Sequence, residues 1–556
     1  MVTISAFKTY ITAGIGSTVR DWGLNCPIEF FTYVGERPSS WAMVEAGREI
    51  YGGQRDTYPE IVHGWLRDCA KNHPNCRQPP SVLPSRVINV GTLGSTKVFL
   101  YTSRIKFGRY TALSHCWGKA PTARTTTQNF RQRQQGIPFD VLPQTFQDAV
   151  MVTRSLGIKY LWIDSLCIIQ DDETDWQRES GNMSSIYSNA YFVIGADSSA
   201  DCNGGFLKPK NRQSTFSSPV AQVSNDDGSV STVYTRVRQR HGNICDGTPL
   251  ASRAWTLQEQ LLSSRIVHFT HMEIVWECRT SLRCECMELD AGWVVPSNLK
   301  SKYHKSMKSS LSKERSKIWW DLVEECRNRN ITFETDLLPA LSGIARQMQK
   351  HGAGEYLTGI WKKELPEALM WWSRYSTKYD RVVPYRAPSW SWASLKSSTL
   401  SQFTQNTFAP QHRKLAITYV KVLEAFCIPV GDDYTGAVSS GLLILSAPLI
   451  EVTYNPSGET LKLLDDNAES NAIALFDIQL NLKGGESFHC LFIGESEVDA
   501  NCSPRCEGLI LKHLSENLDY WERVGMFFVD NRRNEKGQFD PRKFFKDAIE
   551  TVVKII

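Results

Sequence analysis

The stretch of residues 160–196, YLWIDSLCIIQDDETDWQRESGNMSSIYSNAYFVIGA, is the part of the chain from which the fold is predicted most directly. Its two apolar ends and its polar middle indicate a strand, a turn, a helix and a second strand. The helix carries a capping-box pattern, since Thr174 is followed three residues later by Gln177. Acidic residues fill its first turn, where the helix dipole favours them, and the start of the helix is therefore well marked.

One acidic residue of this helix, Glu179, falls among apolar residues. Spacings of three and four residues, counted from Trp176, place on one stripe the residues Glu179, Met183, Ile186, Tyr187 and Ala190. We therefore expect Glu179 to point into the core. A buried carboxylate that is ionised and unpaired is costly, so this one either pairs with a cation or hydrogen-bond donors, or is held ready for chemistry.

The segments around this stretch alternate between strand-like and helix-like patterns. Residues 86–118 contain three apolar strand patterns, a helix pattern covers residues 144–156, and a helix near Trp255 precedes a strand and hairpin over residues 265–278. This order predicts an α/β fold with a mostly parallel sheet and flanking helices. At 556 residues the chain is long for a single core. We divide it into an irregular or helical N-terminal segment (1–85), the α/β domain (86–295), a helical extension (296–400) and a mainly β C-terminal module (401–556).

Composition narrows the classes of partner and compartment. The net charge of +4 is small for this length and gives no field that implies nucleic acid. No apolar run reaches the roughly 18 residues that span a bilayer, and the N-terminus lacks the apolar run of a secretory signal. The 15 cysteines are odd in number and often lie inside apolar runs, which is typical of reduced, buried thiols. We expect a cytoplasmic protein with neither a membrane nor a nucleic-acid partner.

A group of metal-ligating residue types follows the helix pattern at residues 61–70. Cys69, His73 and Cys76 supply three ligands, whereas a structural zinc site needs four. The fourth would have to come from a distant cysteine, and the candidates are Cys26, Cys278, Cys284 and Cys286. The alternative is a helix end with buried thiols, and on this basis we expect neither a metal nor a resident cofactor.

Standard catalytic signatures are absent from the sequence, including the P-loop, G-x-G-x-x-G, H-E-x-x-H, G-x-S-x-G and the kinase motifs. A cysteine nucleophile remains conceivable at Cys116 or Cys167, with a histidine as base; the histidines considered are His115, His268 and His271. Both cysteines lie in apolar, strand-like surroundings, which favours structural thiols.

Three blocks of this sequence resemble the signature of a known family. YTALSHCWG (residues 110–118), LWIDSLCIIQ with the following DWQRE and IYSNA, and SRAWTLQE (residues 252–259) are similar to the blocks of the fungal heterokaryon incompatibility (HET) domain, in the same order. The flanking WLRDCAKNHPNC, LLPALSGIA and RAPSWSWAS also resemble regions that accompany this domain, so the resemblance covers most of residues 65–394. One departure is His115, where an aromatic such as tyrosine is usual.

The resemblance implies a fungal protein of nonself recognition that triggers programmed cell death when incompatible hyphae fuse. Its implied partners are other proteins of an incompatibility system, together with copies of itself when it is active. Two alternatives stay open: a non-catalytic interaction or signalling module, and an accessory protein of a secondary-metabolite biosynthetic gene cluster.

The HET domain has also been likened to the TIR domain, a flavodoxin-like fold whose NAD-cleaving members carry a catalytic glutamate on a helix shortly after a tryptophan. That likeness implies NAD as a substrate, with Trp176 and Glu179 in the positions of the tryptophan and the glutamate. The spacing here is three residues, where four is more usual, and one residue rotates a helical side chain by roughly 100°.

The chemistry implied is cleavage of the nicotinamide glycosidic bond, whose oxocarbenium-like transition state a buried carboxylate stabilises. Glu179 is the catalytic candidate, and Trp117 or Trp176 could stack on a base. The residues expected to contact the ligand are Ser114, Trp117, Gly118, Asp164, Trp176 and Arg253.

Other roles remain open for these residues. Glu179 could instead pair with Arg253, and Asp164 could cap a turn. The block Arg253, Trp255, Gln258 and Glu259 could stand at the rim of the same pocket or serve as scaffold.

Overall fold

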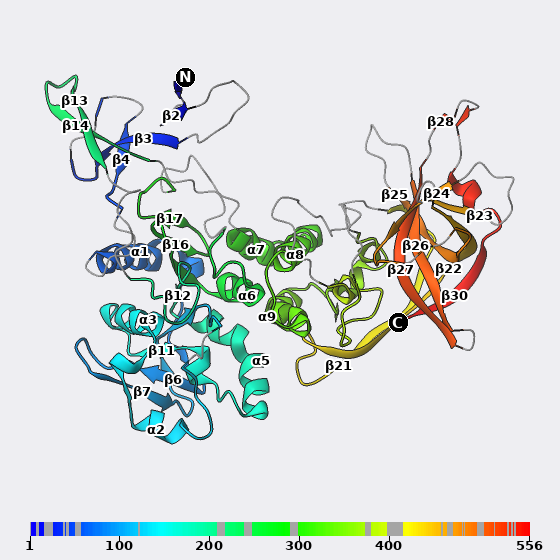
Figure 1. Ribbon diagram of the computed structural model, residues 1–556, viewed down its shortest axis with the longest axis horizontal. Helices are drawn as coiled ribbons and strands as arrows, with labels where there is room; N and C mark the ends of the chain where they lie inside the picture. Colours follow the sequence, from blue (N-terminus) through cyan, green and yellow to red (C-terminus); the bar gives the residue numbers. More distant parts are fainter. Residues whose placement is uncertain are drawn as a thin grey trace. The chain divides into compact units, whose positions relative to one another are not determined.

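The computed structural model divides the chain into two compact units, Met1–His304 and Lys305–Ile556 (Figure 1). It describes residues 2–6, 10–15, 26–36, 39–40, 44–50, 57–119, 123–207, 217–237, 247–289, 299–372, 380–396, 415–456, 460–463, 471–480, 482, 484–496, 505–515, 518–530, 533–534, 537–538 and 541–556. The boundaries expected near residues 85, 295 and 400 fall inside these units and stay predictions.

A nine-stranded sheet forms the centre of the first unit. Its order is β10 (Ile137–Pro138), β7 (Lys97–Thr102), β6 (Arg86–Asn89), β11 (Tyr160–Trp162), β9 (Tyr110–Ser114), β12 (Phe192–Gly195), β15 (Arg265–Phe269), β16 (Ile274–Cys278) and β17 (Leu282–Cys284). Only the central strands β11, β9, β12 and β15 are parallel, and all other neighbours pair antiparallel. The expected mostly parallel sheet is therefore wrong in detail: the sheet is mixed, because hairpins extend it on both sides.

The parallel strands are buried along their whole length. Every residue of the four segments YTALS, YLW, FVIG and RIVHF is buried. Such continuous burial is typical of parallel strands that helices cover on both faces. Across the sheet these strands follow the order β11, β9, β12 and β15, which is 2-1-3-4 when they are numbered along the chain. The chain therefore passes from β9 to β11 on one side of β9, and then to β12 on its other side. The change of direction creates a topological switch point at the carboxyl ends of β9 and β12.

The helices of this unit follow the sequence patterns closely. They are α1 (Tyr58–Asn72), α2 (Phe130–Gln135), α3 (Gln144–Ser155), α4 (Asp164–Cys167), α5 (Glu173–Asn189) and α6 (Ala254–Leu262). The start of α5 differs from the expected capping box, because the side chain of Asp172 caps the helix by accepting a 3.0 Å hydrogen bond from the backbone N–H of Asp175. The helix thus begins one residue earlier than Thr174.

The N-terminal segment contains more strand than expected. The strands β1 (Val2–Ala6), β2 (Tyr10–Ile15), β3 (Cys26–Tyr33) and β4 (Glu45–Gly47) form a sheet with β13 (Ser218–Ser224) and β14 (Val230–Val237). Strand β3 pairs with β14, which lies far away in the sequence, so the local pattern that was interpreted as irregular carried no sign of the partner. A short ladder joins β5 (Ser81–Val82) to β8 (Phe107–Gly108).

The second unit begins with helices and ends with strands. Helix α7 (Leu299–Lys308) crosses the boundary between the units, and α8 (Ser312–Arg327) and α9 (Leu337–Lys350) follow. The hairpin β18 (Tyr356–Leu357) and β19 (Ile360–Trp361) turns at Gly359, whose carbonyl accepts from the indole N–H groups of Trp319 and Trp392. These bonds explain why the Trp-rich segment 389–394 is buried.

Most of the remaining described residues lie in one sheet. Its order is β20 (Leu415–Thr418), β25 (Ser487–Ser496), β26 (Arg505–Ser515), β27 (Leu518–Asp530), β24 (Asn471–Phe476), β23 (Thr460–Leu463), β22 (Val438–Asn455) and β21 (Lys421–Pro429), with β30 (Ile549–Ile555) paired to β22 and β27. A two-stranded ladder joins β28 (Arg533–Asn534) and β29 (Gly537–Gln538).

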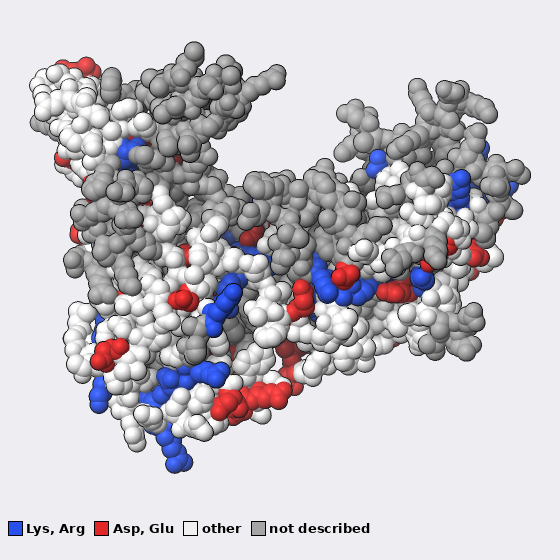
Figure 2. Space-filling model, viewed as in Figure 1, with Lys and Arg blue, Asp and Glu red and all other residues white. Residues whose placement is uncertain are grey.

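The described surface carries both signs of charge. On the face drawn in Figure 2, Lys and Arg side chains lie beside Asp and Glu side chains. Within the described residues, none of the helices combines the length and the apolar character that crossing a membrane requires.

Candidate functional site

A cluster of polar side chains lies at the switch point of the sheet. Ser114 ends β9 and pairs with Gly195, the last residue of β12, so both mark the carboxyl edge of the parallel strands. Asp164 follows β11 at the same edge. Because open α/β sheets bind ligands in the crevice at such a point, this edge is where a site is expected on topology alone.

Glu259 is a buried carboxyl group at this edge. It lies on α6, which packs against α5, and its side chain is 6 % exposed. Burial raises its pKa to about 7, while the hydroxyl groups of Ser114 and Tyr187 oppose the rise by hydrogen bonding. Its second oxygen, Oε2, has no hydrogen-bond partner among the described residues. A carboxyl group in this state can hold or release a proton near neutral pH.

Trp117 and Asp164 form the outer part of the cluster. The indole Nε1 of Trp117 donates a 2.8 Å hydrogen bond to Oδ2 of Asp164, and both residues are half-buried. The other oxygen of Asp164 accepts a 2.6 Å bond from the N–H of Ser165, the next residue in the first turn of α4. Gly118 follows with a φ of +77°, and a Cβ there would lie 2.3 Å from the Cβ of Asp201. Only glycine fits this turn.

Arg253 brings a cation to the same place. Its Nη1 donates a 2.7 Å hydrogen bond to the carbonyl of His115, the residue after Ser114. Its charge lowers the pKa of Glu259, although burial dominates. His115 is buried, and desolvation lowers its pKa, so the imidazole is neutral at pH 7. Sequence-predicted Ser114, Trp117, Gly118, Asp164 and Arg253 thus lie together at one edge of the sheet.

The two cysteines considered as nucleophiles have the properties of structural thiols. Burial raises the pKa of Cys116 to about 11 and that of Cys167 to about 12. Both are therefore protonated at neutral pH, and a thiol is a poor nucleophile. His268, one of the candidate bases, is held between Oδ2 of Asp197 at 3.0 Å and Oε2 of Glu277 at 3.5 Å.

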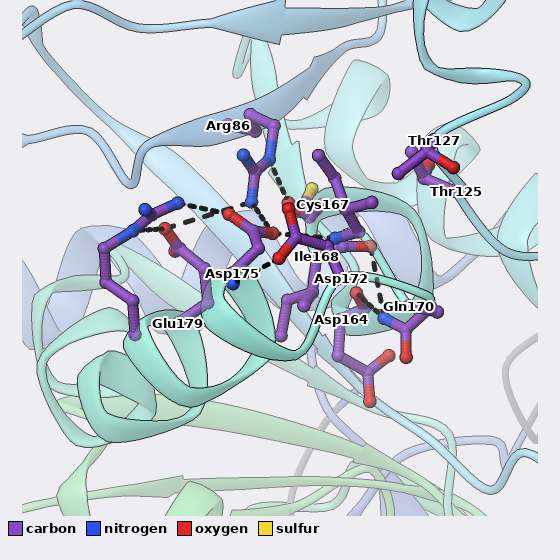
Figure 3. A network of polar contacts seen from close by, with 12 residues as sticks. Arg86, Thr125, Thr127, Asp164, Cys167, Ile168, Gln170, Asp172, Asp175 and Glu179 are labelled. Carbon is purple, nitrogen blue, oxygen red and sulfur yellow. Dashed lines mark hydrogen bonds and ion pairs between the residues drawn. The ribbon is translucent and has the colours of Figure 1, made fainter. Parts of the chain in front are cut away.

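Glu179 lies near the start of α5 in a network of polar contacts with Arg86 and Asp175, and Figure 3 draws Asp164 in the same network. It is buried, as expected, at 2 % exposure. Its Oε1 lies 3.9 Å from a guanidinium nitrogen of Arg86 and 3.3 Å from one of Arg178. Arg86 also holds Asp175 at 2.5 Å. Glu179 therefore pairs with arginines, as one alternative in the sequence held, but the partners are Arg86 and Arg178, so the choice of Arg253 is wrong.

Trp176 departs from the stripe on which the sequence placed it. Its side chain is 43 % exposed, whereas Glu179, Met183 and Ile186 are buried. In the first turn of α5 the buried side chain is that of Asp175, the residue before Trp176. Trp176 is consequently on the surface of α5.

Glu259 and Tyr187 are the residues whose importance the sequence understated. Both lie in the blocks that were quoted, but Glu259 was interpreted only as a rim or scaffold residue and Tyr187 as a core residue. One feature of the sequence could have drawn attention to Glu259: it lies four residues after Trp255 and therefore on the same face of α6.

The opposite edge of the sheet has a cavity of about 470 Å³. Its lining comes from α1 and from the segments that precede the parallel strands, and includes Arg67, Arg109, Lys159, Tyr160 and Tyr191. This volume is within the range of ligand pockets. None of the residues predicted for the site lines it.

Comparison with known proteins identifies the α/β domain. Residues 110–259, from the first residue of β9 to Glu259, match the family described as heterokaryon incompatibility protein (HET). The chain therefore carries a HET domain over these residues, and the match suggests a role in heterokaryon incompatibility. No curated protein and no solved structure matches the chain. The likeness to the TIR domain is thus not confirmed.

Proposed function

We propose that this protein acts in fungal nonself recognition and programmed cell death, and that its HET domain hydrolyses NAD at the carboxyl edge of β9, β11 and β12. The observation that carries the proposal is Glu259, a buried carboxyl group whose pKa is raised to about 7 and whose Oε2 lacks a partner among the described residues. The expected setting is the cytoplasm, with other incompatibility proteins and further copies of this chain as partners.

The reaction needs a group of this kind. The bond from the anomeric carbon to the nicotinamide nitrogen breaks, nicotinamide leaves with the electron pair, and water adds to the carbon to give ADP-ribose and one proton. An ionised Glu259 stabilises the positive charge that develops on the ribose ring. It can also take the proton from the attacking water, because its pKa lies close to neutral pH.

The surrounding residues would bind and orient the dinucleotide. Trp117 is half-buried and fixed by Asp164, so its ring can stack on a base with little loss of side-chain entropy. In this proposal the guanidinium of Arg253, which bonds to the carbonyl of His115, would attract the pyrophosphate. Ser114 and Tyr187 are placed to keep the carboxyl group of Glu259 oriented toward the ribose.

Glu179 is the second candidate for the same role, from the TIR likeness. Its carboxylate is engaged by two arginines, which leaves less of it for a substrate. We therefore assign the chemistry to Glu259 and a stabilising ion pair to Glu179.

The test compares purified full-length protein with the variants Glu259→Gln and Glu179→Gln in an assay of nicotinamide release. Glutamine nearly preserves the shape of both side chains and removes the charge. The proposal predicts loss of turnover in Glu259→Gln and retained turnover in a folded Glu179→Gln. Absence of turnover in the wild type as well would favour the signalling module that acts without catalysis.

A further inference from the structure

We propose that Cys69, His73, Cys76 and Cys278 bind a structural zinc ion that links the N-terminal helix α1 to the sheet of the HET domain. One ligand atom from each residue lies within 4.8 Å of all the others. The sequence spacing offered only three of these ligands, and the fold supplies the fourth from the end of β16. Cys26, another candidate for the fourth position, lies outside the residues whose side chains are described.

The distances in this cluster fit a tetrahedral zinc centre. Zinc–sulfur bonds of about 2.3 Å and zinc–nitrogen bonds of about 2.05 Å give ligand-to-ligand edges of about 3.5 Å between sulfur and nitrogen. Nδ1 of His73 lies 3.4 Å from Sγ of Cys278. The cluster is therefore already close to the size that the ion requires.

Local backbone structure positions all four ligands. Cys69 lies in the last turn of α1, His73 is the C-cap of that helix, and Cys76 ends the short 3₁₀ helix Pro74–Cys76. The N–H of Cys76 bonds to the carbonyl of His73 at 2.9 Å, which folds the three ligands onto one another. Cys278 is the last residue of β16 and opens a tight turn.

That turn directs backbone donors at the sulfur of Cys278. The N–H groups of Thr280 and Ser281 lie 3.4 and 3.2 Å from its Sγ. Two N–H donors stabilise a thiolate, which is the form that binds metal. A neutral buried thiol would gain little from this arrangement.

A buried cation, Arg265, lies beside the cluster, where it can balance the net charge of a zinc centre with three thiolates. Arg265 is 1 % exposed, and its Nε lies 3.3 Å from Sγ of Cys69. In the described part of the chain it forms no ion pair with a carboxylate, and its other partners are the carbonyls of Tyr191 and Cys76. Arg279 and Lys300 also interact electrostatically with Cys76 and Cys278. Zn²⁺ with three thiolates carries one net negative charge, which compensates the buried guanidinium.

The ligand set indicates the metal and its role. Three thiolates and one imidazole form a closed set of protein ligands, which is typical of structural zinc, whereas catalytic zinc keeps a position open for water. Binding releases a proton from each thiol that is not already ionised. The ion would cross-link residues that flank residues 110–259 on both sides, His73 and Cys278 being 205 positions apart.

A neighbouring cluster offers a matched control. Glu273, Cys284 and Cys286 also lie together, but they supply only three ligand atoms. Cys284 and Cys286 are buried like the proposed ligands, so serine at both positions imposes a similar loss of packing without touching the proposed site.

The first experiment measures zinc in full-length protein purified without chelators or a metal-affinity tag. We expect about one zinc per chain in the wild type and in Cys284→Ser/Cys286→Ser, and below about one tenth of that ratio in Cys69→Ser/Cys278→Ser. Metal-free protein from zinc-supplemented cultures would overturn the proposal, as would zinc that survives in Cys69→Ser/Cys278→Ser and disappears from the control. A Cys69–Cys278 or Cys76–Cys278 disulfide in the unreduced wild type would overturn it too.

A second measurement needs no variant and covers the case in which the ligand variant fails to fold. Zinc is removed from the wild type with a chelator under native conditions, and Co²⁺ is added as the probe. We expect a sulfur-to-cobalt charge-transfer band and the spectrum of a tetrahedral ion, together with a melting temperature that falls on chelation and recovers with zinc. A melting temperature that chelation leaves unchanged, or an octahedral cobalt spectrum, would contradict a structural site.

Discussion

The indole nitrogen of Trp117 donates a 2.8 Å hydrogen bond to Oδ2 of Asp164, and this bond joins the loop after β9 to the start of α4 after β11. The carboxyl group of Glu259 is buried, and the charge of Asp164 helps to raise its pKa. The proposed site therefore combines a fixed aromatic ring, Trp117, with a carboxyl group that can be protonated, Glu259. Both lie at the switch point of the strand order.

Trp117→Phe removes the donor and keeps an aromatic ring. We expect a loss of about 1 kcal/mol in stability, since Asp164 loses one hydrogen bond. The larger effect should be on NAD turnover, because the ring is no longer fixed. Asp164→Asn is the control: its side-chain oxygen can still accept from Trp117, so turnover in this variant should exceed that of Trp117→Phe. Equal turnover in both variants would show that the bond does not position the ring.

The stability of the protein should depend on pH through Glu259. Burial raises the pKa of this carboxyl from 4.5 to about 7, so the folded state binds its proton more tightly than the unfolded state. The contribution of Glu259 to the free energy of unfolding is complete below about pH 4.5 and is lost as the pH rises through about 7. Relative to the wild type, Glu259→Gln should gain stability over this window, up to a limit on the order of 3 kcal/mol.

The measurement is thermal melting of both proteins between pH 5 and pH 8, pH values chosen on either side of the pKa of about 7. A difference in melting temperature that stays constant over this range would mean that Glu259 does not titrate there.

Arg86 should be important for stability because it is 7 % exposed and lies against two buried carboxylates, Asp175 and Glu179. Arg86→Met leaves both carboxylates without their buried cation, and we expect a loss of about 3–5 kcal/mol. Arg178→Met is the matched control, since Arg178 contacts the same carboxylates but its side chain is 55 % exposed. Its loss should be within about 1 kcal/mol. Similar melting temperatures for the two variants would contradict the prediction that Arg86 stabilises the fold much more than Arg178 does.

Gly118 should tolerate no side chain. Gly118→Ala requires a positive φ and places a Cβ 2.3 Å from that of Asp201, so the loop at the proposed site must move. Gly157→Ala is the comparison, because Gly157 has a φ of +67° and no atom within 4 Å of the added carbon. We expect about 1 kcal/mol for the backbone strain in both variants, and a further loss of stability and of NAD turnover in Gly118→Ala alone. Melting and nicotinamide release measured on both variants test this.

Local patterns predicted the elements around the site well. The helix over residues 144–156 is α3, the hairpin over residues 265–278 is β15 with β16, and the inward position of Glu179 is confirmed. Each of these depends on periodicity or on turn residues close by in the chain, which a single sequence contains.

Contacts between distant segments could not be predicted in the same way. Strands β7 to β11 and helices α2, α3 and α4 lie between Arg86 and Glu179 in the chain, so no local pattern favoured Arg86 over Arg253 as the partner. Cys278 reaches Cys69 only because α1 packs on β16, where Trp65 lies against Trp276. The raised pKa of Glu259 likewise depends on burial by several elements at once.

The most direct measurement is nicotinamide release from NAD by the purified wild type beside Glu259→Gln and Glu179→Gln, with melting curves to confirm that all three are folded. We predict turnover by the wild type and by Glu179→Gln, none by Glu259→Gln, and a wild-type rate that rises with pH through about 7 as Glu259 ionises. Turnover that survives in Glu259→Gln and is lost in a folded Glu179→Gln would contradict the assignment and move the chemistry to α5.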